Sequence, residues 1–189
     1  TANITAKTLT ATASASNKVY DGNTTASVTL TFTGLVGDET LGQTVGATFA
    51  DKNVANAKTV TVNSITLSDD GGLASNYTIS TGQTTTANIT PKALTIGGIT
   101  ASNKTYNGNT TATIDVSAAT FSGLVVGDDV TVSATGTFDN KNVGTGKTVT
   151  LVETNAGDDV GNYTITDQGS TTANITAKTL TATASASNK

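Results

Sequence analysis

The chain contains long internal repeats, and these limit its possible folds more than any other feature. Residues 1–18 and 172–189 share one sequence, TANITAKTLTATASASNK, at an offset of 171 residues. The block returns between them in altered form, as TANITPKALTIGGITASNK over residues 86–104. Because a sequence that recurs at fixed spacing folds as copies of one structural unit, we predict two units of 85 and 86 residues.

Shorter motifs recur at the same spacing and support this division. They are Tyr-Asp/Asn-Gly-Asn-Thr-Thr-Ala at residues 20–26 and 106–112, Lys-Asn-Val at 52–54 and 141–143, and Asn-Tyr-Thr-Ile at 76–79 and 162–165. We therefore predict a first domain over residues 1–90, a second over 91–176, and the first strand of a truncated third repeat over 177–189. The identical ends also suggest that the chain was cut from a longer array.

The local pattern of each unit predicts β-strands. Polar and apolar residues alternate in KTLTATA (7–13), ASVTLTFT (26–33) and KTVTV (58–62), and the residues involved favour strands. Asp21-Gly22 and Asn107-Gly108 are preferred dipeptides of tight hairpin turns. The one short helical candidate, residues 51–58, is interpreted as a loop or a single turn, because its counterpart contains two glycines.

About seven short strands per unit are typical of a small β-sandwich. We therefore predict an all-β chain: two tandem sandwiches, immunoglobulin-like in shape only, arranged in an elongated rod. A β-solenoid would need a repeat of 20 to 30 residues, and no such shorter period is found. A β-grasp-like module remains the alternative and would need one true helix.

The predicted core of the first unit consists of the large apolar residues at alternating positions: Leu9, Tyr20, Val28, Leu30, Phe32, Phe49, Val60, Val62, Tyr77, Ile79 and Ile89. The second unit contains the equivalent set. Residues 84–104 join the two units without a Gly/Ser-rich linker, so we expect a stiff connection. Pro91, the only proline, removes one amide donor there and fits a bend or a sheet edge.

Composition excludes several classes of function. The chain has no Cys and no His, so thiolate or imidazole catalysis, disulfides and the usual zinc sites are all impossible. Its net charge of -4 argues against nucleic acid as a partner. No apolar run is long enough to span a membrane. We therefore predict that the protein is not an enzyme and that this part of it does not insert into a membrane.

The ordered set of motifs resembles the YDG and related MBG-type repeats. The set comprises Lys-x-Tyr-Asp/Asn-Gly-Asn-Thr-Thr-Ala, Asp/Asn-Lys-Asn-Val, Asn-Tyr-Thr-Ile and Thr-Ala-Asn-Ile-Thr-x-Lys-x-Leu-Thr, and it covers essentially the whole chain. The second copy departs by reading Tyr106-Asn107-Gly108, which preserves the turn. Such repeats occur in tandem in large bacterial surface adhesins similar to filamentous haemagglutinin. The resemblance implies an extracellular array on the bacterial surface and provides no catalytic residue.

Acidic pairs in loops are the only candidates for a metal site. The candidate calcium ligands are Asp69, Asp70, Asp158 and Asp159, because Ca²⁺ binds six to eight oxygens and acidic loops can supply them. No spacing here reproduces a known calcium loop, so adjacent solvated aspartates are the alternative. A covalent cross-link from a lysine to an amide or carboxyl is also conceivable at the lysines that recur in both units: Lys52, Lys58, Lys141 and Lys147.

Two functions from different classes remain. The first is a structural spacer that projects a distal binding region from the cell, with adjacent repeats of the same protein as its partners. The second is an adhesive module that itself binds a glycan or protein on a host or bacterial surface. A binding site should present an exposed aromatic or polar cluster, yet each unit has only four aromatic residues and most are needed for the core. This favours the spacer.

Overall fold

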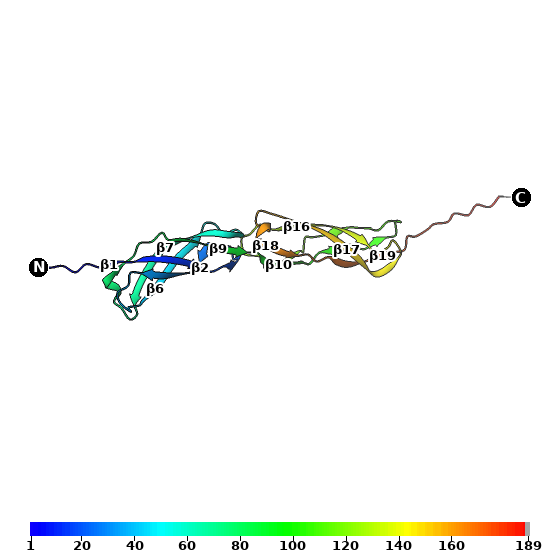
Figure 1. Ribbon diagram of the computed structural model, residues 1–189. Coiled ribbons are helices and arrows are strands. Elements are labelled where there is room, and N and C mark those ends of the chain that lie inside the picture. The colour runs from blue at the N-terminus through cyan, green and yellow to red at the C-terminus, as the bar shows by residue number, and fades with distance from the viewer. Residues whose placement is uncertain (188–189) are drawn as a thin grey trace. The chain divides into compact units, whose positions relative to one another are not determined.

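The structure is a computed structural model that describes residues 1–187, and its regular secondary structure consists of strands and two short helical turns (Figure 1). It divides into two compact units, one formed by Thr1–Lys92 with Gly161–Thr164 and the other by Ala93–Val160 with Ile165–Lys189. The prediction of an all-β chain with two tandem units is confirmed. The helical segments among residues 1–187 are the 3₁₀ turns η1 (Ala74–Asn76) and η2 (Val160–Asn162), so the β-grasp-like alternative lacks its helix in this part of the chain.

The first unit is organised around a five-stranded sheet in the order β3-β9-β7-β6-β4. Two-stranded sheets, β2-β5 and β1-β8, complete it. The strands are β1 (Lys7–Thr8), β2 (Thr10–Ala15), β3 (Lys18–Val19), β4 (Thr25–Ala26), β5 (Val28–Thr33), β6 (Leu41–Phe49), β7 (Ala55–Asp69), β8 (Tyr77–Thr78) and β9 (Thr84–Thr90).

The second unit repeats this topology. Its five-stranded sheet has the order β12-β19-β17-β16-β13, beside the sheets β11-β14 and β15-β10-β18. The strands are β10 (Lys92–Gly97), β11 (Thr100–Ala101), β12 (Lys104–Thr105), β13 (Thr111–Ala112), β14 (Ile114–Asp115), β15 (Thr120–Ser122), β16 (Thr131–Phe138), β17 (Gly144–Ala156), β18 (Tyr163–Thr166) and β19 (Ser170–Thr176).

A parallel pair of strands lies at one edge of each five-stranded sheet. Strand β3 pairs with β9 through Lys18 and Ile89, and β12 pairs with β19 through Lys104 and Ile175. The other pairs in these sheets are antiparallel, and the pairs β7-β9 and β17-β19 carry a bulge at the same place. Because parallel strands need a long connection, β3 is joined to β9 only after most of the unit has intervened.

Alternation along the strands determines the core. In β7, Val60 and Val62 are at most 1% exposed, and every other residue of the strand is half-buried or exposed. Most of the predicted core residues are buried, and Val28, Phe32 and Ile79 are half-buried. Leu41, at the start of β6, belongs to the core as well. The core of the second unit clusters around Phe138, Val149 and Ile175.

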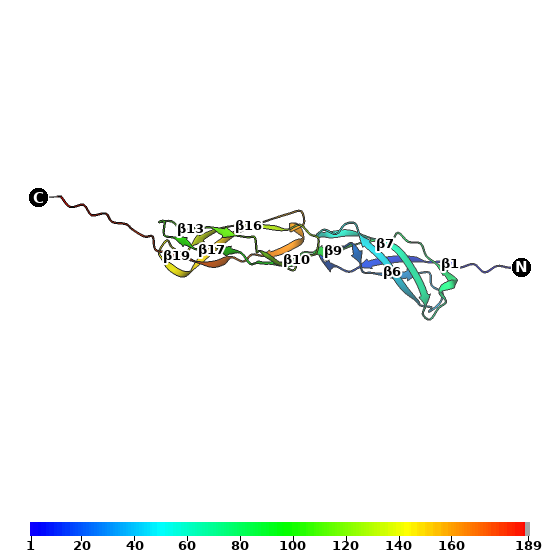
Figure 2. The same ribbon diagram turned by 180° about the vertical axis from the view of Figure 1, so that it is seen from behind.

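The two terminal segments differ from their internal copies. Ile4 is fully exposed, whereas Ile175, at the same place in the identical motif, is 1% exposed inside β19. Leu180 is 88% exposed, whereas its counterpart Leu9 is 2% exposed. Residues 177–187 leave the sheet as an extended chain that forms no strand (Figure 2). Residues 188 and 189 of the predicted third-repeat strand lie outside the described residues.

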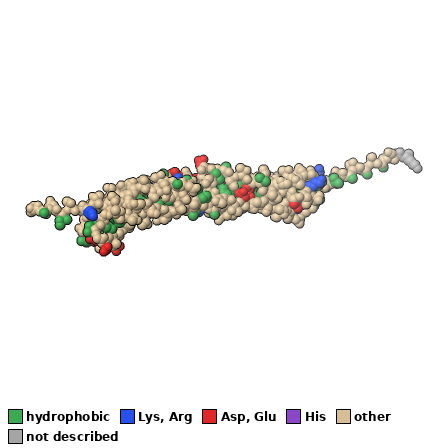
Figure 3. Space-filling view, viewed as in Figure 1, with side chains coloured by type: hydrophobic (Ala, Val, Ile, Leu, Met, Phe, Trp, Pro, Cys, Tyr) green, Lys and Arg blue, Asp and Glu red, His purple; other side chains and the backbone are tan. Residues whose placement is uncertain are grey.

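The surface is mostly uncharged. Figure 3 shows few acidic or basic side chains on the viewed face, and uncharged polar groups and backbone cover most of it. Neither of the two helical turns found within residues 1–187 has the length or hydrophobicity needed to cross a membrane.

Candidate functional site

Tyr20 lies at the centre of a closed aromatic site in the first unit. It follows β3, where its N–H donates to the carbonyl of Thr90 at 2.9 Å, and its side chain is 1% exposed. The ring of Tyr163 contacts it edge to face, with 5.5 Å between the ring centroids and an interplanar angle of 76°. The ammonium of Lys52 lies 5.9 Å from the Tyr20 centroid, a cation–π distance. We call this the Tyr20 site.

Asn162 completes the Tyr20 site with hydrogen bonds. It is only 5% exposed, and its Oδ1 accepts the backbone N–H of Val54 at 2.9 Å. Its Nδ2 donates to Oδ1 of Asn53 at 3.4 Å. Burial of an amide side chain is unfavourable unless its polar atoms find partners, and here the Lys-Asn-Val motif supplies them. The Asn162-Tyr163 copy of the Asn-Tyr motif therefore fits against Tyr20 and the Lys-Asn-Val loop.

The second unit contains the same groups in an open arrangement. Tyr106 follows β12, and its N–H donates to the carbonyl of Thr176 at 2.8 Å, as Tyr20 does to Thr90. Tyr106, Asn142, Val143 and the segment from Ala177 to Leu180 line a depression of about 380 Å³. Tyr106 is half-buried and Val143 is 55% exposed. We call this depression the Tyr106 site.

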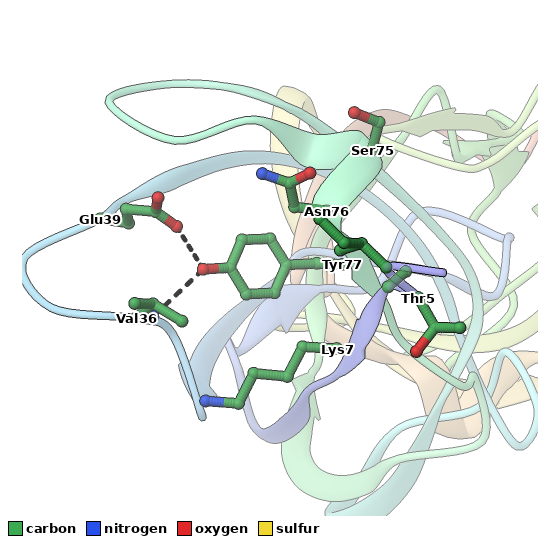
Figure 4. A pocket seen from close by; sticks show the side chains of 9 residues that line it. Thr5, Lys7, Val36, Glu39, Ser75, Asn76 and Tyr77 are labelled. Carbon is green, nitrogen blue, oxygen red and sulfur yellow. Dashed lines mark hydrogen bonds between the residues drawn. The ribbon is translucent and has the colours of Figure 1, made fainter. Parts of the chain in front are cut away.

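A second depression, of about 430 Å³, surrounds Tyr77 in the first unit (Figure 4). The Tyr77 hydroxyl donates to the Glu39 carboxylate and accepts the N–H of Val36 at 3.1 Å. Donation to Glu39 stabilises the protonated phenol and raises the pKa of Tyr77. The Lys7 side chain extends beneath the ring in Figure 4. In contrast to Asn162, the neighbouring Asn76 is exposed.

Lysines of both units are held in turns. Lys18 binds Asp21 at 2.6 Å, and its counterpart Lys104 binds Oδ1 of Asn109 at 2.8 Å. Each ammonium also lies over a phenylalanine, at 5.7 Å from the ring centroid in the first unit and 5.5 Å in the second. These lysines fix the Tyr-Asp/Asn-Gly turns, which position the tyrosines just described.

A second pair of lysines binds carboxylates near the Lys-Asn-Val loops. Lys58 binds Asp51 at 2.5 Å, and Lys147 binds Asp139 at 2.7 Å. The hydrogen bond from each lysine, together with a backbone amide, holds the pKa of Asp51 and of Asp139 below the usual range. In the structure both contacts are ion pairs.

The candidate calcium residues form hydrogen bonds within and between loops, Asp69 and Asp159 through their carboxylates and Asp70 and Asp158 through their backbone. Asp69 accepts the N–H of Ala74 at 2.7 Å, and the Asp70 carbonyl accepts the Thr40 hydroxyl. In the second unit, Asp159 accepts the N–H of Asp129 at 3.0 Å, and the Asp158 N–H donates to Asp129 at 3.3 Å. Within residues 1–187, no three acidic side chains gather closely enough to hold a metal ion.

Tyr20 was predicted to lie in the core, but its contacts with Tyr163 and Lys52 were not predicted. The motif that contacts Tyr20, Asn-Tyr-Thr-Ile, occurs twice in the sequence. The copy at residues 76–79 is nearer to Tyr20 in the chain than the copy at residues 162–165, which makes the contact. The contact with Lys-Asn-Val joins residues more than 100 positions apart in the chain. The recurrence of three polar motifs at constant spacing was the available signal.

Comparison with known families identifies the repeated unit. The YDG domain matches residues 5–87 and again residues 90–173. A search of curated proteins and a search of solved structures found no match to the chain.

Proposed function

Because the chain belongs to the YDG domain family, with two domains in tandem, we propose that it is a structural spacer of a bacterial cell-surface adhesin. The parent protein would be similar to filamentous haemagglutinin. In this role the domains project a distal binding region away from the cell, and their partners are adjacent repeats of the same protein. The proposal places the chain outside the cell and assigns it no catalysis and no cofactor.

One observation carries this proposal: the same topology occurs twice with almost no chain between the copies. Strand β9 ends at Thr90 and β10 begins at Lys92, so Pro91 alone separates them. A single proline, whose φ is fixed, leaves the connection little conformational freedom. A stiff connection suits a rod, whereas a flexible linker would let the domains fold back on themselves.

The distribution of aromatic side chains also favours a spacer. Tyr20, Phe49, Tyr77, Phe138 and Tyr163 are buried, and the other three aromatic residues are half-buried. Carbohydrate and protein ligands are commonly held by exposed aromatic rings in a concave site. The alternative, an adhesive module that binds host or bacterial glycan or protein directly, would have to rely on uncharged polar side chains.

Two measurements on the purified chain test the proposal. Small-angle scattering should give a maximum dimension close to the summed lengths of two domains, and a glycan array and a cell-binding assay should give only background signal. Saturable binding to a glycan or to cells, lost when surface threonines are changed, would favour the adhesive module. A compact scattering profile would contradict the rod. Protease accessibility of the parent protein on intact bacteria tests the extracellular location separately.

A further inference from the structure

We propose that the Tyr106 site is a docking surface for the Asn-Tyr-Thr segment of a further YDG repeat. The occupant has the sequence of residues 76–78 and belongs to the repeat that would follow in the same array, as Gly161–Thr164 follows the first unit. The inference deepens the spacer proposal by naming the residues through which repeats would meet. It does not depend on the adhesin, since domains can dock whatever the parent protein does.

The Tyr20 site provides the template, because the first unit already holds such a segment. There, Gly161–Thr164 belongs to the unit by its contacts. Its asparagine accepts the Val54 N–H at 2.9 Å, and its tyrosine lies edge to face on Tyr20. The contact therefore involves both residues of the Asn-Tyr pair.

The Tyr106 site carries the same chemical groups. Tyr106 corresponds to Tyr20, and Lys141-Asn142-Val143 is identical to the loop that binds Asn162. The strand beside each site, β9 or β19, ends in Thr-Ala-Asn-Ile-Thr, and the tyrosine N–H donates to the carbonyl of its last threonine in both units. A backbone donor at residue 143, an amide at residue 142 and an aromatic face at residue 106 are thus available together.

Exposure shows that the Tyr106 site lacks its cover. Tyr20 is 1% exposed, whereas Tyr106 is half-buried beside an open depression of about 380 Å³. Leu180 also lines this depression and is 88% exposed, although the equivalent leucines, Leu9 and Leu94, are at most 2% exposed. An apolar side chain that is buried in both complete copies of the repeat is exposed only here.

The first unit contains a copy of the proposed occupant. Asn76 lines the Tyr77 depression and is exposed, whereas Asn162, its counterpart, is 5% exposed in the Tyr20 site. Tyr77 is already ordered by Glu39 and Val36, so little side-chain entropy would be lost on docking. By analogy with the Tyr20 site, Oδ1 of the incoming asparagine would accept the Val143 N–H.

Cross-linking between introduced cysteines tests this docking. The chain has no native cysteine, so the reagent can react only with the introduced thiols. Residues 1–18 and 172–189 are identical, so appending residues 19–189 after Lys189 lengthens the array without altering its sequence. One cysteine replaces Val143, and a second replaces the copy of Ser75 in the appended segment. A short bis-maleimide should join them at least about ten times faster than a control pair in which the second cysteine replaces the copy of Thr31, an exposed residue of β5.

The same reagent distinguishes the two sources of the occupant. Mixing Val143→Cys with Ser75→Cys on separate chains of 189 residues tests docking between copies. Cross-linking in the extended chain alone would assign the site to the next repeat of one chain, where the linkage raises the effective concentration. Cross-linking in both would add association between chains. Rates equal to those of the Thr31→Cys control in both experiments would overturn the proposal.

A stability measurement makes the test independent of cysteine reactivity. Extension of the chain should raise the urea midpoint of the second unit, and Asn142→Ala combined with Tyr106→Ala should abolish that rise. Circular dichroism of each variant in the unextended chain checks that it folds. An unchanged midpoint on extension would also overturn docking, whereas the spacer proposal would fail only on the scattering and binding measurements.

Discussion

Tyr20 and Tyr106 occupy the same position in two copies of one repeat, yet their surroundings differ. Tyr20 is 1% exposed and contacts the ring of Tyr163, whereas Tyr106 lines an open depression. Each tyrosine follows an edge strand in parallel pairing, and its N–H donates to the last threonine of the Thr-Ala-Asn-Ile-Thr motif on the neighbouring strand, β9 or β19. The comparison indicates that each repeat forms the tyrosine site, and that a separate Asn-Tyr segment is needed to cover it.

The largest expected effect comes from removal of the two tyrosines. Tyr20→Ala should destabilise the first unit by about 3 kcal/mol, because it empties a fully buried aromatic position. Tyr106→Ala should destabilise the second unit by only about 1 kcal/mol, since its ring is already partly in water. Urea unfolding followed by NMR signals of each unit measures both. Equal losses for the two variants would show that exposure of Tyr106 has no energetic consequence.

A smaller difference is expected between two asparagines of the same motif. Asn162→Ala leaves the Val54 N–H without its acceptor and should cost about 1–3 kcal/mol. Asn76→Ala alters an exposed residue and should change stability by less than about 0.5 kcal/mol. The free energy of unfolding from urea titrations provides the comparison. Should Asn76→Ala prove as harmful as Asn162→Ala, the buried hydrogen bond would not be the cause.

Regular alternation made much of the strand content predictable. KTVTV (58–62) lies in β7 and ASVTLTFT (26–33) includes β5, because one face of each strand packs on the core. Strand β6 was not predicted, since Gly42 and Gly46 interrupt its pattern. A Cβ at either position would come within 2.4 Å of a serine Oγ on the neighbouring strand β7. Each serine Oγ can rotate aside, and the serine Cβ atoms lie at ordinary contact distance, so the glycines weaken the alternating pattern of β6 without being required by β7.

The candidate site was less predictable than the fold. The tyrosines and the Lys-Asn-Val motif stand out in the sequence as repeated, but their pairing depends on contacts between distant segments. The parallel pairing of β3 with β9 joins residues about 70 positions apart and has the same origin. Repetition adds an ambiguity of its own, because every motif has two copies and sequence alone does not say which copy is the partner.

Acid should weaken the ion pairs that flank the two loops. The Lys58 hydrogen bond lowers the pKa of Asp51 below its usual 3.8, so this pair stabilises the folded state above that pH. The stabilisation is lost as the pH falls below 3.8 toward the folded pKa. Asp51→Asn should remove this part of the pH dependence and cost about 0.5 kcal/mol or less at pH 7, because Asp51 is exposed to solvent.

The second unit provides a natural control for that variant. Lys147 forms the equivalent ion pair with Asp139 at 2.7 Å, and the variant leaves that pair intact. Urea midpoints between pH 2 and pH 5 should therefore show that Asp51→Asn flattens the acid response of the first unit and leaves the second unchanged. An unaltered slope in the first unit would mean that Asp51 is not the group responsible.

Calcium is expected to have the smallest effect of all. The Asp69 and Asp159 carboxylates already accept backbone N–H groups at 2.7 and 3.0 Å, which leaves few free oxygens for an ion that needs six to eight. We therefore expect the thermal midpoint in millimolar Ca²⁺ to differ from that in EGTA by less than about 1 °C, a shift within the range that weak surface charge effects produce. The variant Asp158→Asn with Asp159→Asn serves as the matched control. A larger stabilisation that this variant abolishes would establish a calcium site at the loop joining β17 to η2, and would separate that loop from its counterpart at Asp69 and Asp70.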